Sequence, residues 1–214
     1  MRDTRLVFPV VALLASLSLI PATGFTQLGN NTSVLNPNTA EAAEMAALPS
    51  MGNTLADNIV AARPLSSNGS LDELLGSDLN QEEKALIREK LFLPINLNSA
   101  SDEEIMLVPG MSGKMAHEFD EYRPYDSLDQ FRREMGKYVD EDEVARFEQY
   151  VFVPMDLNTA SDEDFATIPA MSKKMIHEFE EYRPYKSMEQ FRREIGKYVD
   201  DKELARLERY VEIR

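Results

Sequence analysis

The fold of this chain is decided by a stretch of sequence that occurs twice, at 96–151 and at 156–211. The first copy reads NLNSASDEEIMLVPGMSGKMAHEFDEYRPYDSLDQFRREMGKYVDEDEVARFEQYV, and the second reads DLNTASDEDFATIPAMSKKMIHEFEEYRPYKSMEQFRREIGKYVDDKELARLERYV. Aligning 94–153 with 154–213 needs no gap and gives about 37 identical positions out of 60. Such agreement indicates a tandem duplication, with one repeat over 94–153 and a second over 154–214.

The same offset of 60 residues identifies part of a third copy before the first full repeat. Leu71 aligns with Phe131, and Gly76 aligns with Gly136. We therefore interpret 70–93 as the second half of a repeat whose first half is missing. Because a solenoid end needs a cover for its apolar side, this half repeat is expected to cap the array.

Each full repeat carries start and stop signals for short helices. Ser101, Ser127 and Asp140 each stand three residues before a Glu or Gln, which is the spacing of a capping box. The second repeat has the same arrangement, with Asp164 as a weaker substitute for Glu104. Pro109 and Pro124 end the first two helices. Apolar residues recur at helical spacing, and no stretch of alternating apolar and polar residues is long enough for a strand. The sequence predicts an all-α fold with four helices of roughly seven to twelve residues per repeat.

The N-terminal part is expected to be a targeting segment followed by a tether. Arg2 and Arg5 precede the apolar stretch 6–20, which is short for a membrane-spanning helix, and a small-residue cleavage site follows at 22–24. We interpret 1–24 as a cleaved signal peptide, with cleavage after Ala42 or an uncleaved anchor as alternatives. Residues 25–69 are rich in Asn, Ser, Thr, Ala and Pro and are interpreted as a flexible linker. The mature protein would then be periplasmic or secreted, without stable membrane insertion.

Composition narrows the function further. The chain contains no cysteine, which excludes disulfides, thiolate zinc sites and a cysteine nucleophile. Its formal net charge is −15, which on average repels nucleic acid. No Ser-His-Asp set, phosphate loop or HExxH motif is present, so we expect neither an enzyme nor a small-molecule substrate, and no cofactor. His117 and His177 each stand four residues before a Glu, which gives too few ligands for a metal site.

The run from Asn96 to Phe119 resembles the helix-hairpin-helix family, and is closest to the small exported DNA-uptake proteins of the ComEA type. The resemblance covers about 70–213. It implies two short helices joined by a hairpin whose glycines let backbone amides approach a phosphate of double-stranded DNA. The residues that match this device are Gly110, Met111, Ser112, Gly113 and Lys114 in the first copy, and Met171, Ser172, Lys173 and Lys174 in the second.

The sequence departs from that pattern where phosphate would bind. Ser112 stands at the second glycine position, and Ala170 and Ser172 replace both glycines in the second copy. In the second hairpin of each repeat, Asp140 or Asp200 stands at the helix start, where it caps the helix and repels an anion. The net charge is −8 over 94–153, from 6 basic and 14 acidic residues, and −3 over 154–214, from 11 and 14. We therefore expect the side chains to have taken over the helix ends.

A docking role is the leading hypothesis, and binding of duplex DNA is the alternative. The partner would be an unidentified protein of the cell envelope; the small extrinsic subunit family of photosystem II, which the DLN and PY-x-S-x-E segments resemble, shows that such folds occur without DNA binding. Exposed Tyr and Arg are common at interfaces. The candidate interaction surface comprises Tyr122, Arg123, Tyr182, Arg183, Arg192 and Arg193. A purely structural role for the Tyr-Arg-Pro-Tyr runs, with Tyr125 in the core and Arg123 paired with a carboxylate, is the competing interpretation.

Overall fold

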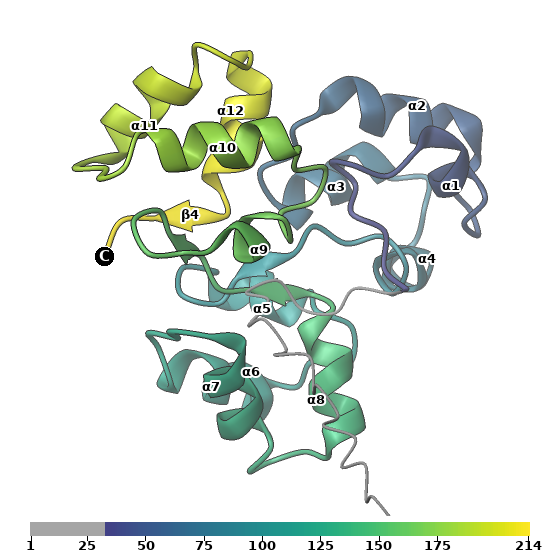
Figure 1. Ribbon diagram of the computed structural model, residues 1–214. Helices are drawn as coiled ribbons and strands as arrows, with labels where there is room; N and C mark the ends of the chain where they lie inside the picture. The colour runs from purple at the N-terminus through teal and green to yellow at the C-terminus, as the bar shows by residue number, and fades with distance from the viewer. Residues whose placement is uncertain (1–32) are drawn as a thin grey trace, which may run out of the picture.

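The computed structural model describes residues 33–214 and is mostly helical (Figure 1). The signal peptide expected over 1–24 and the first part of the expected linker lie outside the described residues. Within 33–214 there are twelve helices and four strands of two residues each. No helix among these residues is both long enough and apolar enough to span a membrane.

The helices fall into three groups of four, and corresponding helices start about 60 residues apart. We name the groups unit 1 (34–93), unit 2 (94–153) and unit 3 (154–213). Unit 1 contains α1 (Ala42–Ala46), α2 (Gly52–Ala62), α3 (Asn68–Leu75) and α4 (Gln81–Arg88). Unit 2 contains α5 (Asp102–Met106), α6 (Gly113–Glu121), α7 (Leu128–Met135) and α8 (Glu141–Glu148). Unit 3 contains α9 (Asp162–Phe165), α10 (Lys173–Glu181), α11 (Met188–Ile195) and α12 (Asp201–Glu208).

Short parallel pairings join the beginning of each unit to its end. In unit 2, β1 (Ile95–Asn96) pairs with β2 (Val151–Phe152). In unit 3, β3 (Met155–Asp156) pairs with β4 (Val211–Glu212). Unit 1 has a single parallel bridge in the same place, between Leu35 and Leu91. Sequence patterning did not predict these strands, because two residues are too few to show an alternation.

The expectation of a flexible linker over 25–69 is wrong for residues 33–69. This segment forms α1, α2 and the start of α3, and its Met45, Ala56 and Ile59 are fully buried in a hydrophobic cluster. Residues 33–93 therefore contain four helices, α1 to α4. The second candidate cleavage site, Ala40-Glu41-Ala42, lies at the start of α1 inside this folded unit.

Side-chain caps explain why the helices begin where they do. The capping boxes expected at Ser101 and Ser161 are both present. Ser127 accepts a hydrogen bond from the backbone amide of Gln130, but the Gln130 side chain accepts from the amide of Asp126 instead of closing the box. A Ser, Asp or Asn cap of this kind stabilises a helix by about 1 kcal/mol. These caps matter here because α5 and α9 span only five and four residues, which is too short for an isolated helix to be stable.

The cores of units 2 and 3 are aromatic, whereas the core of unit 1 is aliphatic. Phe119 packs edge-to-face on Phe131 at 5.1 Å between ring centroids, and Phe179 packs in the same way on Phe191 at 5.1 Å. The corresponding residues of unit 1 are Ile59 and Leu71, and the whole cluster there consists of aliphatic side chains, alanines and methionines. Each unit therefore has a core cluster of its own, although Val34 and Phe92 of unit 1 join the cluster of unit 2, and Phe152 of unit 2 joins that of unit 3. The same backbone frame accommodates two kinds of packing.

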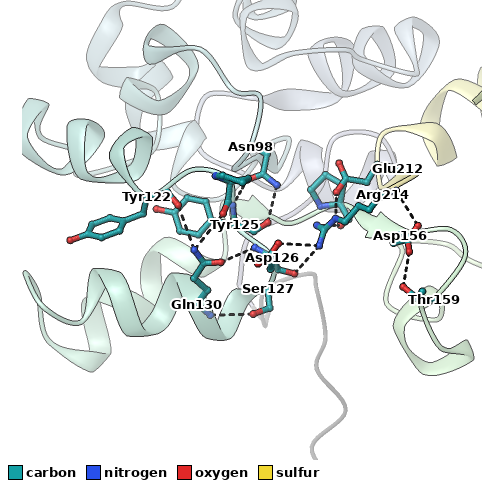
Figure 2. Close-up of polar contacts among 12 residues, drawn as sticks. Asn98, Tyr122, Tyr125, Asp126, Ser127, Gln130, Asp156, Thr159, Glu212 and Arg214 are labelled. Carbon is teal, nitrogen blue, oxygen red and sulfur yellow. Dashed lines mark hydrogen bonds and ion pairs between the residues drawn. The ribbon is translucent and has the colours of Figure 1, made fainter.

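The three units also contact one another through polar groups. Tyr150 of unit 2 donates a hydrogen bond to the Glu89 carbonyl of unit 1, and the Asn36 amide of unit 1 donates to the Tyr210 hydroxyl of unit 3 at 3.3 Å. Figure 2 shows a third contact, in which Arg214 reaches both Asp126 of unit 2 and Glu212 beside it. In Figure 1, α6, α7 and α8 of unit 2 lie below, with units 1 and 3 above. The arrangement leaves the outer faces of α6 and α10 open to solvent.

Candidate functional site

The turn before the second helix of each unit has the same backbone conformation despite different residues. Gly110 has φ +72°, and the corresponding Ala170 and Ser50 have φ +58° and +62°. This is the left-handed region, which costs an L-residue roughly 1–2 kcal/mol. A side-chain hydrogen bond to this turn is also repeated in units 2 and 3. Arg146 donates to the Pro109 carbonyl, and Arg206 donates to the Pro169 carbonyl. The loss of glycine at Ala170 has therefore not changed the turn.

The helix ends that would hold a phosphate are capped by side chains. Ser112 accepts a hydrogen bond from the Met115 amide at 3.2 Å, and Ser172 accepts from the Met175 amide at 3.1 Å. At the second hairpin, Asp140 and Asp200 each accept from the amide three residues on, at 2.9 Å. Side-chain caps are therefore present at all four helix starts. Met111 and Met171 are half-buried against the cores of their units, whereas Gly113 is exposed.

Two arginines of the candidate interaction surface, Arg192 and Arg193 on α11, are engaged by carboxylates. Arg192 contacts Glu208, and this contact is the main cause that raises the pKa of the guanidinium. Arg193 bonds Glu194 at 2.8 Å. Lys173 and Lys174 are exposed at the start of α10, away from these pairs. The candidate interaction surface therefore presents little net positive charge at Arg192 and Arg193.

Arg123 and Arg183 hold the backbone of their own units. Arg123 donates through Nε to the Leu97 carbonyl at 2.5 Å and through Nη2 to the Ala100 carbonyl at 2.7 Å, and it pairs with Asp120. Arg183 makes the same bonds to Leu157 and Ala160. Because these donors already bind backbone carbonyls, Arg123 and Arg183 are not part of the interaction surface proposed below.

An asparagine completes this arrangement in every unit. The Asn98 side chain donates to the Tyr125 carbonyl at 2.9 Å and accepts from the Tyr125 amide at 2.6 Å (Figure 2). Asn38 and Asn158 make the same two bonds, with Leu65 and Tyr185. We call the pairs Asn38–Arg63, Asn98–Arg123 and Asn158–Arg183 the asparagine–arginine clamps. The side chain of Tyr125 is fully buried beside its clamp. Within the Tyr-Arg-Pro-Tyr run, Arg123 and Tyr125 therefore have structural roles.

Tyr122 and Tyr182 belong to a different, solvent-facing arrangement that occurs once in unit 2 and once in unit 3. The hydroxyl of Tyr122 lies 2.8 Å from that of Tyr138, and the hydroxyls of Tyr182 and Tyr198 are 2.9 Å apart. A lysine Nζ lies over each ring, at 4.8–5.7 Å from the ring centroid. We call these two groups the tyrosine–lysine clusters; they comprise Lys114, Glu118, Tyr122, Lys137 and Tyr138, and Lys174, Glu178, Tyr182, Lys197 and Tyr198.

A buried carboxylate lies behind each pair of rings. Glu118 and Glu178 are 8% and 7% exposed, and one carboxylate oxygen of each has no hydrogen-bond partner among the described residues. The pKa of Tyr138 is raised, first by its hydrogen bond with Tyr122 and then by its hydrogen bond with Glu118, and Tyr198 behaves in the same way. Each cluster is therefore a connected chain of groups running from the surface into the unit.

Sequence reasoning found only one tyrosine of each pair. Tyr138 and Tyr198, which are 37% and 38% exposed, are absent from the candidate interaction surface predicted from the sequence. The available signal was that Lys137-Tyr138 recurs as Lys197-Tyr198, whereas the partial copy has Ser77-Asp78 at these positions.

A groove of about 930 Å³ between α7 and α8 of unit 2 was also missed. Val139, Val144 and Ala145 line it together with the charged residues Arg132 and Asp140. In unit 3, Leu204 stands in place of Val144 and packs against Gly196. Leu204 is larger than Val144 by one methylene group.

The two histidines do not form a metal site with the residues around them. His117 Nε2 lies 3.5 Å from Glu121, and His177 Nε2 lies 3.8 Å from Glu181, with both imidazoles largely exposed. Across residues 33–214, no group of three or more His, Asp or Glu side chains is placed to hold a metal ion.

The fold and these surfaces together define a mostly helical protein with repeated, solvent-facing aromatic groups. Comparison of the chain with protein-family models, with curated proteins and with solved structures finds no match.

Proposed function

We propose that this chain is an exported, non-catalytic binding protein of the helix-hairpin-helix class, which docks to another protein of the cell envelope through its two tyrosine–lysine clusters. The observation that carries the proposal is a comparison within the chain. Units 2 and 3 each display the cluster, while unit 1 has the same order of helices without it. The fold therefore does not require the cluster, and its duplication is better explained by a binding role.

The chemistry of the clusters suits a protein interface. Tyrosine offers a large contact area at a small cost in side-chain entropy, and it is enriched at the residues that dominate binding energy. The hydrogen bond between the hydroxyls holds each pair of rings in one arrangement before a partner arrives. Lys114 and Lys174 lie beside the rings, on helices whose outer faces are exposed.

Two equivalent clusters on one chain would also allow two-point binding. When a partner contacts both, the second contact forms within one complex, and the overall affinity can exceed that of either contact by about 10²–10⁴. Loss of one cluster is then expected to weaken binding strongly, and loss of both to abolish it.

The test is capture of envelope proteins by the immobilised full chain. We expect the wild type to retain a partner that Tyr138→Ala combined with Tyr198→Ala does not retain. The control is His117→Ala with His177→Ala, because these side chains are also duplicated and are 73% exposed on α6 and α10, the helices that carry Lys114 and Lys174 of the clusters. A partner retained equally by wild type and the tyrosine variant would exclude the clusters as the docking surface.

Non-sequence-specific binding of duplex DNA is the second candidate, and one observation favours it. The left-handed turn before α6 and α10 is preserved even where glycine is replaced, and exposed lysines follow it. Such a turn places helix-end amides near the solvent, where they attract anions.

A mobility shift with random duplex at low salt tests this candidate. If DNA binds, Lys173→Glu with Lys174→Glu should weaken it, and the logarithm of the binding constant should fall linearly with that of the salt concentration. Lys202→Glu, an exposed charge change on α12, is the control. Absence of any shift at low salt would exclude the DNA candidate.

A further inference from the structure

We propose that Tyr122–Tyr138 and Tyr182–Tyr198 are sites of oxidative cross-linking, at which a carbon–carbon bond forms between the two phenol rings of each pair. In each pair, both tyrosines belong to the same unit. The proposal goes beyond docking and does not depend on it, since it concerns the chemistry of the tyrosines themselves.

The hydroxyl groups are already placed as they are in the product. When two phenols are joined through the ring carbons next to their hydroxyls, the two oxygens flank the new bond and lie within hydrogen-bond distance. In this chain the oxygens are 2.8 Å apart in unit 2 and 2.9 Å apart in unit 3. The ring centroids are 6.4 Å apart in both pairs, with the planes tilted at 55° and 51°, so the rings must approach each other to react. Solvent on their outer side leaves room for that movement.

Accessibility directs oxidation to these two pairs. The chain has eight tyrosines, and four of them, Tyr125, Tyr150, Tyr185 and Tyr210, are buried. The other four are the members of the two pairs, with Tyr138 and Tyr198 more than one-third exposed. A diffusing oxidant therefore meets only tyrosines that already contact another tyrosine.

The reaction balances with a peroxide as oxidant. Each phenol loses one electron and one proton to become a phenoxyl radical, and the two radicals couple at ring carbons. The hydrogens on those carbons then move to the oxygens and restore both phenols. Two electrons and two protons are released in total, and a haem peroxidase passes them to hydrogen peroxide, which becomes two molecules of water. Glu118 or Glu178, the buried carboxylate behind each pair of rings, has an oxygen without a hydrogen-bond partner among the described residues and is placed to accept the first proton.

The cross-link would act as a staple in a chain that has no cysteine. It joins residues 16 positions apart, from the end of α6 to the loop between α7 and α8, and does the same between α10 and the loop after α11. Closing a loop in this way lowers the entropy of the unfolded chain, as a disulfide does.

The experiment treats the dilute full chain with hydrogen peroxide and a haem peroxidase, and then maps linked peptides by mass spectrometry. We expect bonds between 122 and 138 and between 182 and 198 within single chains, together with the fluorescence of linked tyrosines. Tyr138→Phe should remove the first bond and leave the second, and Tyr198→Phe should do the reverse. Thermal unfolding of the oxidised wild type should move upward by roughly 5–10 °C, while the doubly substituted chain should not move.

Three results would overturn the proposal. One is the absence of linked tyrosines under conditions that oxidise free tyrosine. Another is linkage that joins separate chains in place of the two named pairs. The third is equal yield of both bonds in Tyr138→Phe and in wild type, because phenylalanine has no hydroxyl from which the radical can form.

Discussion

Unit 1 differs from units 2 and 3 in its side chains far more than in its backbone. All three have an asparagine–arginine clamp, a left-handed residue in the turn before the second helix, and a parallel pairing between their two ends. Only units 2 and 3 have an aromatic core and a tyrosine–lysine cluster. The clamp, the left-handed turn and the parallel pairing are thus sufficient for the backbone arrangement that all three units share, which we call the common frame.

The difference separates structural from functional residues without an alignment of other proteins. In unit 1 the positions of the tyrosine–lysine cluster are occupied by small or polar residues: Thr54, Asn58, Ala62, Ser77 and Asp78. These replacements leave the helices in place. A side chain kept in all three units therefore indicates the common frame, and an exposed one kept only in units 2 and 3 indicates a role beyond it. The following predictions test that division.

The largest expected effect is on the cores. Phe131→Ala should lower the free energy of unfolding by about 4 kcal/mol, and Leu71→Ala, the same position in unit 1, by about 3 kcal/mol. Both side chains are almost completely buried, and the larger one leaves the larger cavity. Chemical denaturation of the full chain measures both values. If Leu71→Ala were nearly neutral, unit 1 would not be an independent core, and the comparison between units would fail.

Next comes the clamp, which should behave alike in all units. Arg63→Lys, Arg123→Lys and Arg183→Lys should each cost about 2 kcal/mol, because a lysine ammonium cannot replace a guanidinium that binds two carbonyls at once. Arg133→Lys is the control, since Arg133 is exposed and bonds only Glu134. A loss confined to one unit would show that the clamp is not part of the common frame.

Much of the fold could be predicted from the duplicated stretch, and the part that was missed has a physical explanation. The caps at Ser101 and Ser161 could be read directly because they depend on residues three apart. The first half of unit 1, which falls within 25–69, is predicted to be a linker because its Asn, Ser, Thr, Ala and Pro residues are typical of a tether. The sequence Asn36-Pro37-Asn38-Thr39-Ala40 matches the start of the later repeats and was the signal that could have revealed it.

The candidate site was less predictable, because its partners are distant along the chain. Arg123 reaches a carbonyl 26 residues earlier, and Tyr122 meets a tyrosine 16 residues later. Neither distance follows from helical periodicity. The sequence therefore leaves both interpretations of the Tyr-Arg-Pro-Tyr run open, whereas in the structure Tyr122 lies half-buried beside Tyr138 and Arg123 binds the backbone.

A smaller effect should separate unit 2 from unit 3 at the left-handed turn. Gly110→Ala should destabilise the chain by about 1–2 kcal/mol, because φ is positive there and the added Cβ would lie 2.8 Å from Arg146. Ala170→Gly should be neutral or stabilise by up to about 1 kcal/mol, since relief of strain is partly offset by the freedom of unfolded glycine. Thermal and denaturant unfolding measure both changes. Equal destabilisation by the two substitutions would contradict the common turn.

The smallest effect concerns acid titration in units 2 and 3. Lys197 lowers the pKa of Glu194 by a hydrogen bond, with Arg193 as the second cause, and Lys137 and Arg133 act in the same way on Glu134. In unit 1 the carboxylate position is occupied by Leu74. A carboxylate whose pKa is lowered by folding contributes stability above its unfolded pKa, and that stability is lost as the pH falls through the folded pKa. Protection from hydrogen exchange around α11 should therefore weaken in acid.

Lys197→Met sharpens this last test. We expect the pKa of Glu194, followed by nuclear magnetic resonance, to rise toward its ordinary value, while the pKa of Glu134 in unit 2 stays where it was. Arg193 should keep part of the lowering, because it still bonds the same carboxylate. An unchanged pKa at Glu194 would mean that Lys197 remains in solvent. The position of Lys197 over the ring of Tyr182 would then depend on the two tyrosines alone. Glu194 would not be the group that orients this lysine in the cluster.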